Sequence, residues 1–303
     1  MLAAVLDNIK EINVREFQNP TIPTSGAILK VHSCGICSSD LKFINHGDRV
    51  KEFPAILGHE IAGEIIEIDK NTSDFNVGDR VALAAEIPCK KCRPCLNDLE
   101  NLCDNVLSIG TTIQGGFSEF MPLSKDLLVR GPINLIPQNL TYNQASLAET
   151  LGCVINAMDF CRMKSGKTVA IIGAGYMGCL MINVARLLGA KKIVMIDKDA
   201  KRLKRAEAFS ADIYLSTKDL NSFVQLALNE VDNEGFDAVF AACSNTEAFK
   251  QSILLGGKGA YINLFGGINK NENDLVSFSS NFVHYRQITV GGTFSSTKNN
   301  HKT

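Results

Sequence analysis

The feature that most constrains the fold is a glycine-rich turn between an apolar run and a helical pattern. Residues 169–172 are apolar, and the turn 173–178 (GAGYMG) follows them directly. A second apolar run, 193–196, ends at Asp197, which lies 19 residues beyond Gly178. A strand, a G-x-G-x-x-G turn, a helix and a second strand ending in an acid form a βαβ unit of the dinucleotide-binding type. The turn therefore predicts a doubly wound parallel sheet.

Each residue of this turn has a predicted task. Gly173 permits the tight turn, Gly175 lets the backbone approach a pyrophosphate, and Gly178 lets the helix pack closely on the strand. The free N–H groups where the helix begins, at Tyr176 and Met177, would bind the phosphates.

The acid after the second strand bears on the choice of nucleotide. Asp197 can accept hydrogen bonds from both ribose hydroxyls and would repel a 2′-phosphate, which favours NAD over NADP. Lys198, Lys201 and Arg202 weaken that preference, because a nearby cation would compensate the charge of the phosphate.

The rest of the chain fits two domains. Residues 1–150 contain short strand-like runs separated by turn residues, which predicts a small barrel or sandwich. Residues 144–163 have a helical pattern, after which strands and helices alternate. The predicted strands are 168–172, 192–196, 212–215, 237–241, 259–264 and 287–290. The clearest helices are 176–188 and 199–209, and the polar segment 269–281 is predicted to be a loop.

Composition excludes several classes of partner. The chain has 303 residues, 45% of them hydrophobic and 21% charged, with a net charge of −1. No basic field exists to hold nucleic acid or an anionic membrane. The N-terminal apolar run is too short for a signal peptide, and no run is long enough to span a membrane. We therefore expect a soluble, cytoplasmic protein.

Four of the ten cysteines lie within 15 residues, at Cys89, Cys92, Cys95 and Cys103. Clustered cysteines in a reducing compartment indicate a metal rather than disulfides. Four thiolates saturate a tetrahedral zinc ion and leave no position for chemistry, so this site is predicted to be structural. We interpret Cys161, Cys179 and Cys243 as small apolar core residues.

Two N-terminal motifs complete the pattern: residues 35–40 (GICSSD) and 58–60 (GHE). With the cysteine loop and the glycine turn, in this order, they resemble the zinc-containing medium-chain alcohol dehydrogenases over nearly all of the chain. The resemblance implies a β-rich, GroES-like catalytic domain at 1–148 and a Rossmann domain at 149–295. Residues 296–303 would begin a return to the catalytic domain. Family members usually continue well beyond this point, so we expect a truncated C-terminus that lowers stability.

The resemblance also implies a second, catalytic zinc ion. Cys37 and His59 are its implied ligands, with Glu60 as the third protein group. Glu149 stands where liver-type and yeast-type members have a cysteine, and it resembles the sorbitol (polyol) dehydrogenase branch. Which of the two carboxylates binds zinc directly stays open, and Cys34 and Cys153 are interpreted as packing residues.

By the same resemblance, the Ser39 hydroxyl accepts the proton of the alcohol, and a hydride passes to the nicotinamide. Lys42 replaces the histidine of the outer proton relay in liver-type members. His46 is either a substitute or a surface histidine. Phe43 and Phe117 are implied to line the substrate pocket, although both fit a plain apolar core equally well.

The far side of the cofactor is expected to meet the ends of the last two strands, because ligands bind at the carboxyl ends of parallel strands. The candidate contacts there are Leu264, Phe265, Gly292 and Phe294.

The main hypothesis is a zinc- and NAD-dependent dehydrogenase of polyols or secondary alcohols, with two zinc ions per chain. The alternatives are a threonine or simple alcohol dehydrogenase on the same scaffold, and a truncated, non-catalytic protein that binds NAD or zinc. The family implies a homodimer or homotetramer that pairs through the strand near 287–294.

Overall fold

The computed structural model describes residues 1–72, 74–216, 223–269 and 273–301. Its contacts divide the chain into two compact units. Unit 1 comprises Met1–Gly152 and the segment from Ser295 onward, and unit 2 comprises Cys153–Phe294. Within the described ranges, no helix is both long and apolar enough to cross a membrane.

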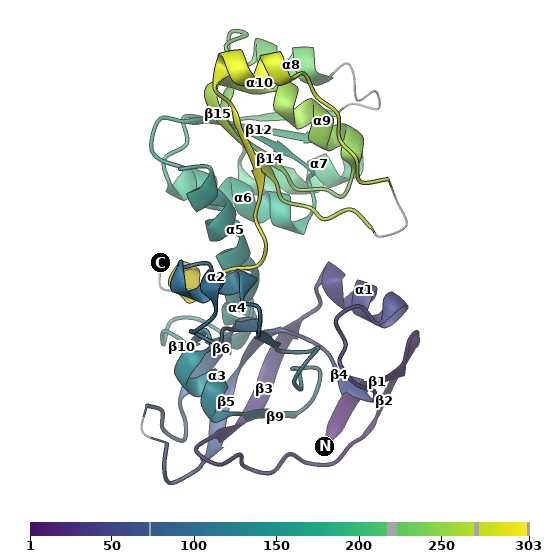
Figure 1. Cartoon of the computed structure of the whole chain (residues 1–303), viewed down its shortest axis with the longest axis vertical. Helices are drawn as coiled ribbons and strands as arrows, with labels where there is room; N and C mark the ends of the chain where they lie inside the picture. The colour runs from purple at the N-terminus through teal and green to yellow at the C-terminus, as the bar shows by residue number, and fades with distance from the viewer. Residues whose placement is uncertain (73, 217–222, 270–272, 302–303) are drawn as a thin grey trace. The chain divides into compact units, whose positions relative to one another are not determined.

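Unit 1 is rich in β-structure (Figure 1). A five-stranded antiparallel sheet has the order β10-β6-β5-β3-β9, and smaller sheets have the orders β2-β1-β4 and β7-β8. The strands are β1 (Leu2–Asn8), β2 (Glu11–Glu16), β3 (Ala27–Gly35), β4 (Ala55–Ile56), β5 (Glu60–Ile68), β6 (Arg80–Leu83), β7 (Glu86–Ile87), β8 (Leu107–Ser108), β9 (Phe120–Leu123) and β10 (Ile133–Leu135). Alternate residues of the large sheet, such as Leu29, Ile61 and Leu83, are buried in one core, as strand periodicity requires.

The helices of unit 1 are short. They are α1 (Ser38–His46), α2 (Arg93–Leu96), η1 (Glu100–Leu102), α3 (Lys125–Arg130), α4 (Tyr142–Ala145), the first turn of α5 (Ala148–Phe160) and η3 (Lys298–His301).

The single helix predicted over 144–163 is wrong, because α4 and α5 are separate helices. Thr141 and Gln144 form a reciprocal capping box that starts α4 early. The Ser146 hydroxyl donates to the carbonyl of Asn143 at 3.0 Å. Such local bonds compete with a continuous helix, and the new helix begins only at Ala148.

Unit 2 confirms the predicted doubly wound sheet. Its six parallel strands have the order β13-β12-β11-β14-β15-β16. The strands are β11 (Thr168–Ile172), β12 (Lys192–Asp197), β13 (Ile213–Ser216), β14 (Phe236–Ala241), β15 (Gly256–Leu264) and β16 (Thr289–Gly292). The helices are the rest of α5, α6 (Tyr176–Leu187), α7 (Ala200–Ala206), η2 (Glu207–Phe209), α8 (Phe223–Asn229), α9 (Thr246–Leu254) and α10 (Ser280–Arg286).

Helices cover both faces of this sheet (Figure 1). Residues of α5, α6 and α7 pack with one set of alternate strand residues, including Ile171 and Phe240. Residues of α8, α9 and α10 pack with the other set, including Ile172 and Val239. Because both faces are buried, the central strands are nearly all apolar, which is why they could be recognised in the sequence.

The loop predicted over 269–281 ends earlier than expected, and residues 270–272 lie outside the described part of the chain. Ser279 caps α10, since its side chain accepts the N–H of Phe282 at 3.2 Å. Phe282 and Val283 then pack against the core. The helix ends at Arg286, and its C-cap Gln287 is left-handed (φ 53°), so the last strand begins two residues later than predicted.

Close packing at Gly178 gives a test of this unit. A Cβ atom there would overlap the carbonyl oxygen of Gly173, a backbone atom that has little room to move. We expect Gly178→Ala to lower the free energy of unfolding by about 1–3 kcal/mol, as overpacking does. Gly267→Ala is the matched control, because open space surrounds that position and its backbone is unstrained. Equal denaturant midpoints for the two variants would contradict the conclusion that close helix–strand packing requires glycine at position 178.

Candidate functional site

The N-terminal candidates Cys37, His59 and Glu60 come together because β3 and β5 pair antiparallel. Gly35 at the end of β3 lies opposite Glu60 at the start of β5. Cys37 follows β3 as the N-cap of α1, and His59 directly precedes β5. One ligand atom from each candidate lies within 4.8 Å of the others. His59 and Glu60 are 6% and 3% exposed and Cys37 is half-buried, so a thiol, an imidazole and a carboxylate meet at one largely enclosed position.

Gly35 makes room for this arrangement. A Cβ atom at position 35 would overlap the carboxylate of Glu60. A larger residue would require that carboxylate to move, so glycine at this position suits the arrangement of the site.

Asp40 is a site residue for which the sequence analysis gave no role. It is buried in the first turn of α1, where its Oδ2 accepts the backbone N–H of Cys37 at 2.8 Å. Its Oδ1 lies 3.4 Å from Nδ1 of His59. A carboxylate on one ring nitrogen fixes the tautomer and leaves the other nitrogen free for a metal. The spacing Cys37-x-x-Asp40, an N-cap and its N3 residue, was the signal that could have revealed it.

The surroundings of His59 are strongly negative. Burial alone lowers the pKa of His59, but the adjacent Asp40 carboxylate, the Cys37 side chain and the charge of Glu149 outweigh burial and raise it to about 11. Without a metal the His59 ring therefore carries a proton on both nitrogens, and a zinc ion at Nε2 would replace one of them. The donors of the site, sulfur, nitrogen and a carboxylate oxygen, are the ones zinc takes in catalytic centres, so the residues fit that ion.

Glu149 and Ser39 lie close to the three-residue group without belonging to it. Glu149 is 6% exposed in the first turn of α5 and acts on His59 through its charge. The hydroxyl of Ser39 lies 3.3 Å from Nε2 of His59, on the ring nitrogen that faces away from Asp40.

The candidate pocket aromatics are part of the apolar core of unit 1. Phe43 is buried with Leu6 and Leu57, and Phe117 packs against the same cluster. Phe43 also meets His59 edge-on, with ring centroids 6.5 Å apart. Cys34 packs against the main core, where burial raises the pKa of its thiol.

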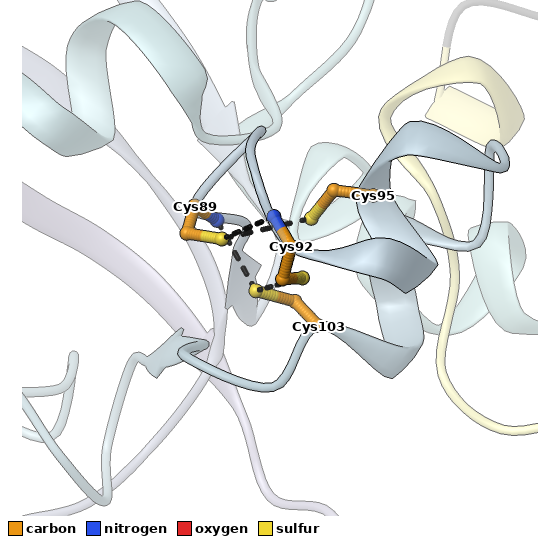
Figure 2. Close-up of side chains that lie close together, drawn as sticks. All are labelled: Cys89, Cys92, Cys95 and Cys103. Carbon is orange, nitrogen blue, oxygen red and sulfur yellow. Dashed lines mark hydrogen bonds between the residues drawn. The ribbon is translucent and has the colours of Figure 1, made fainter.

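The four clustered cysteines converge in unit 1, as Figure 2 shows. The sulfurs of Cys89 and Cys95 are 4.0 Å apart, and those of Cys92 and Cys103 are 3.7 Å apart. Zn–S bonds of about 2.3 Å give tetrahedral edges of about 3.8 Å, so the four sulfurs fit a zinc ion with a closed shell.

Backbone amides prepare this cluster for negative charge. The N–H of Lys91 and that of Cys92 donate to Cys89 and lower its pKa to about 6, whereas burial raises the pKa of Cys95 to about 12. Cys103 accepts the N–H of Cys89 at 3.2 Å. An ion pair between Lys90 and Glu100 joins the two ends of the loop.

The glycine turn in unit 2 has the geometry its sequence predicts. Gly173 is left-handed (φ 114°), Gly175 has no atom within 4 Å of a would-be Cβ, and Gly178 touches the backbone of Gly173. Gly175 is the N-cap of α6, and Tyr176 and Met177 form its first turn. The open space at Gly175 is where a phosphate can approach the helix N-terminus.

Asp197 closes the turn from the end of β12. One of its oxygens accepts the N–H of Ala174 and the other that of Asp199, both at 2.8 Å. A cavity of about 220 Å³ lies beside it, lined also by Arg202 and by Cys243 and Asn245 after β14. Cys243 packs against the core as predicted and also lines this cavity, which was not predicted. Its place at the end of the neighbouring strand was the available signal, because parallel strands end at one edge of the sheet.

The two last strands bring the remaining candidates together. Leu264 and Gly292 are register partners at the ends of β15 and β16. Phe265 packs against the core, and Phe294 is 48% exposed.

The role of Asp40 can be tested by Asp40→Asn, which keeps the size of the side chain and removes its charge. We expect zinc affinity at the Cys37–His59–Glu60 group to fall about 10- to 100-fold, the usual effect of losing a carboxylate behind a histidine ligand. Competition with a chelator measures it. Asp126→Asn is the control, because Asp126 is a half-exposed carboxylate that pairs with Arg130. Unchanged zinc retention in Asp40→Asn would show that this carboxylate serves only to cap α1.

Comparisons with known proteins agree with this geometry. Residues 24–133 match the model of the alcohol dehydrogenase GroES-like domain, and residues 177–303 match that of the zinc-binding dehydrogenases. The sorbitol dehydrogenase of Bacillus subtilis is 30% identical over 302 residues, which cover 97% of this chain and 82% of that protein. D-arabinitol dehydrogenase 1 of Uromyces fabae is 28% identical, with the same two coverages.

A solved structure gives the same fold. A proposed zinc-binding dehydrogenase of Sinorhizobium meliloti, bound to NADP, superposes with a TM-score of 0.89 at 27% identity, covering 99% of this chain and 86% of that one. The motifs, the paired β-rich and Rossmann architectures and these relatives agree with one another. The chain therefore belongs to the zinc-containing medium-chain alcohol dehydrogenase family, with a GroES-like unit and a Rossmann unit.

Proposed function

We propose that this protein oxidises a secondary hydroxyl of a polyol to a ketone and transfers the hydride to NAD. The observation that carries the proposal is the group of half-buried Cys37 and buried His59 and Glu60. The resemblance adds Glu149, at the position where liver-type members have a cysteine. The sorbitol and arabinitol dehydrogenases among the relatives support a polyol as substrate.

The ligand set favours Glu60 over Glu149 as the direct carboxylate ligand, because Glu60 lies in the compact group and Glu149 acts on His59 from outside it. A zinc ion held by Cys37, His59 and Glu60 would supply a Lewis acid that lowers the pKa of the substrate alcohol. A second zinc ion would be held by the four clustered cysteines, where it would stabilise the loop.

The chain's own residues then position the reactants and move the proton. Asp40 holds the His59 ring in one tautomer. The Ser39 hydroxyl, beside Nε2 of His59, accepts the alcohol proton and passes it toward solvent. When bound, NAD would accept the hydride at its nicotinamide ring.

The preference for NAD rests on Asp197. Each of its oxygens accepts one backbone N–H and keeps a lone pair for a ribose hydroxyl. A 2′-phosphate would meet this negative charge directly. Lys198 and Arg202 line the same cavity and are the reason to test NADP as well, since a relative's structure contains it.

One edge of the sheet in unit 2 is formed by β16, with its outer side unpaired in the described part of the chain. We propose that two copies of the chain pair along this strand, within a homodimer or homotetramer.

Substrate choice can be tested with sorbitol, xylitol, threonine, butanediol and ethanol, each with NAD and with NADP. We expect turnover on the polyols with NAD, and kcat/KM at least about 10-fold lower with NADP, because juxtaposed like charges disfavour binding and about 1.4 kcal/mol corresponds to a factor of ten. Cys37→Ser should abolish turnover, which excludes a contaminating enzyme. Preferred turnover of threonine or ethanol would establish an alternative substrate class, and no turnover with any substrate would favour the non-catalytic alternative.

A further inference from the structure

A half-buried histidine near the end of the described chain takes part in none of the motifs above. His301 ends η3 and belongs to unit 1. Its Nε2 lies 2.7 Å from the hydroxyl of Ser296, which is 6% exposed. Its ring also hydrogen-bonds the backbone of Ala148, the first residue of α5.

The two contacts fit a neutral imidazole. A neutral ring has one donor and one acceptor nitrogen, so it donates to the Ala148 carbonyl and accepts the hydroxyl proton of Ser296. Burial lowers the pKa of His301 to about 4, against the smaller raising effect of the bond to Ala148. The ring is therefore uncharged and fully hydrogen-bonded at neutral pH.

The ring lies against one turn of α5. A Cβ atom at Gly152 would overlap the His301 ring, so only glycine permits this approach. Ala148 and Gly152 are one helical turn apart, and Glu149 lies on that same turn. His301 thus contacts the backbone that carries the carboxylate acting on His59.

The segment that presents His301 is itself tied down. The side chain of Asn300 accepts the backbone N–H and the hydroxyl of Thr297, at 2.8 and 2.9 Å. Lys298 reaches the carbonyl of Val129 at 3.4 Å. These bonds hold the segment that carries the ring, so η3 can act as a fixed support for the first turn of α5.

We propose that His301 is a positioning residue that holds the first turn of α5, so that the carboxylate of Glu149 stays directed at His59. The inference rests on the proposed role of Glu149 in the active site. A displacement of about 1 Å at a reacting centre can cost about 100-fold in rate, so a support of this kind is expected to affect turnover.

The test is a double-mutant cycle between position 301 and Glu149, which separates an effect through Glu149 from a general structural one. His301→Phe keeps the bulk of the ring and removes both hydrogen bonds, whereas His301→Gln can still donate and accept. His284→Ala, an exposed histidine of unit 2, is the matched control.

We expect His301→Phe to lower kcat for a polyol and zinc affinity at the Cys37 group by about 10-fold, the scale of lost outer support at a metal site. KM for NAD should not change, and His301→Gln should restore most of the loss. In a Glu149→Gln background, His301→Phe should have no further effect. Ser296→Ala is a milder second variant that should behave in the same way if His301→Phe does not fold.

Losses that multiply in the double variant would overturn the proposal, since they would show that His301 acts independently of Glu149. Full activity and zinc affinity in both His301→Phe and Ser296→Ala would overturn it as well. Zinc affinity, measured by chelator competition, needs no turnover. If the wild type oxidises no polyol, the proposed function fails. The double-mutant cycle can then still be measured through zinc affinity, which decides the role of His301.

Discussion

The register between β3 and β5 is the constraint on which the candidate active site depends. Pairing Gly35 with Glu60 places the end of one strand beside the start of the other, so Cys37 and His59 meet although 21 residues separate them. A slip of one residue would turn the side chain of Glu60 to the opposite face of the sheet. The missing Cβ of Gly35 then leaves the volume that the Glu60 carboxylate occupies.

The two cysteine-containing groups of unit 1 differ in the number of ligands that each offers a metal ion. The four-cysteine loop offers four sulfurs 3.7–4.0 Å apart in the measured pairs, which completes a tetrahedral shell. The Cys37 group offers three donors, and the carboxylates of Asp40 and Glu149 act on its histidine from outside. If this group binds zinc as proposed, three protein ligands would leave a position for substrate, and the surrounding negative charge would favour retention of the cation.

Motif spacing predicted the chemistry better than it predicted the element boundaries. The glycine turn and the parallel strands were predictable because burial on both faces makes such strands almost wholly apolar. The break between α4 and α5 and the start of α10 depend on single side chains, Ser146 and Ser279, that bond the local backbone. Periodicity does not record such bonds. Asp40 and His301 were missed because their roles arise from contacts between distant segments. Asp40 lies 19 residues before its partner His59, and His301 lies 153 residues after its partner Ala148.

The central proposal is that the chain binds two zinc ions, one among the four cysteines and one between Cys37, His59 and Glu60. The most direct measurement is anomalous X-ray scattering on either side of the zinc absorption edge, from crystals of the protein grown without added metal. The account predicts two zinc peaks, one at each of these groups. A peak at the cysteine cluster alone, with none beside His59, would contradict the claim and leave a structural zinc site without a catalytic one.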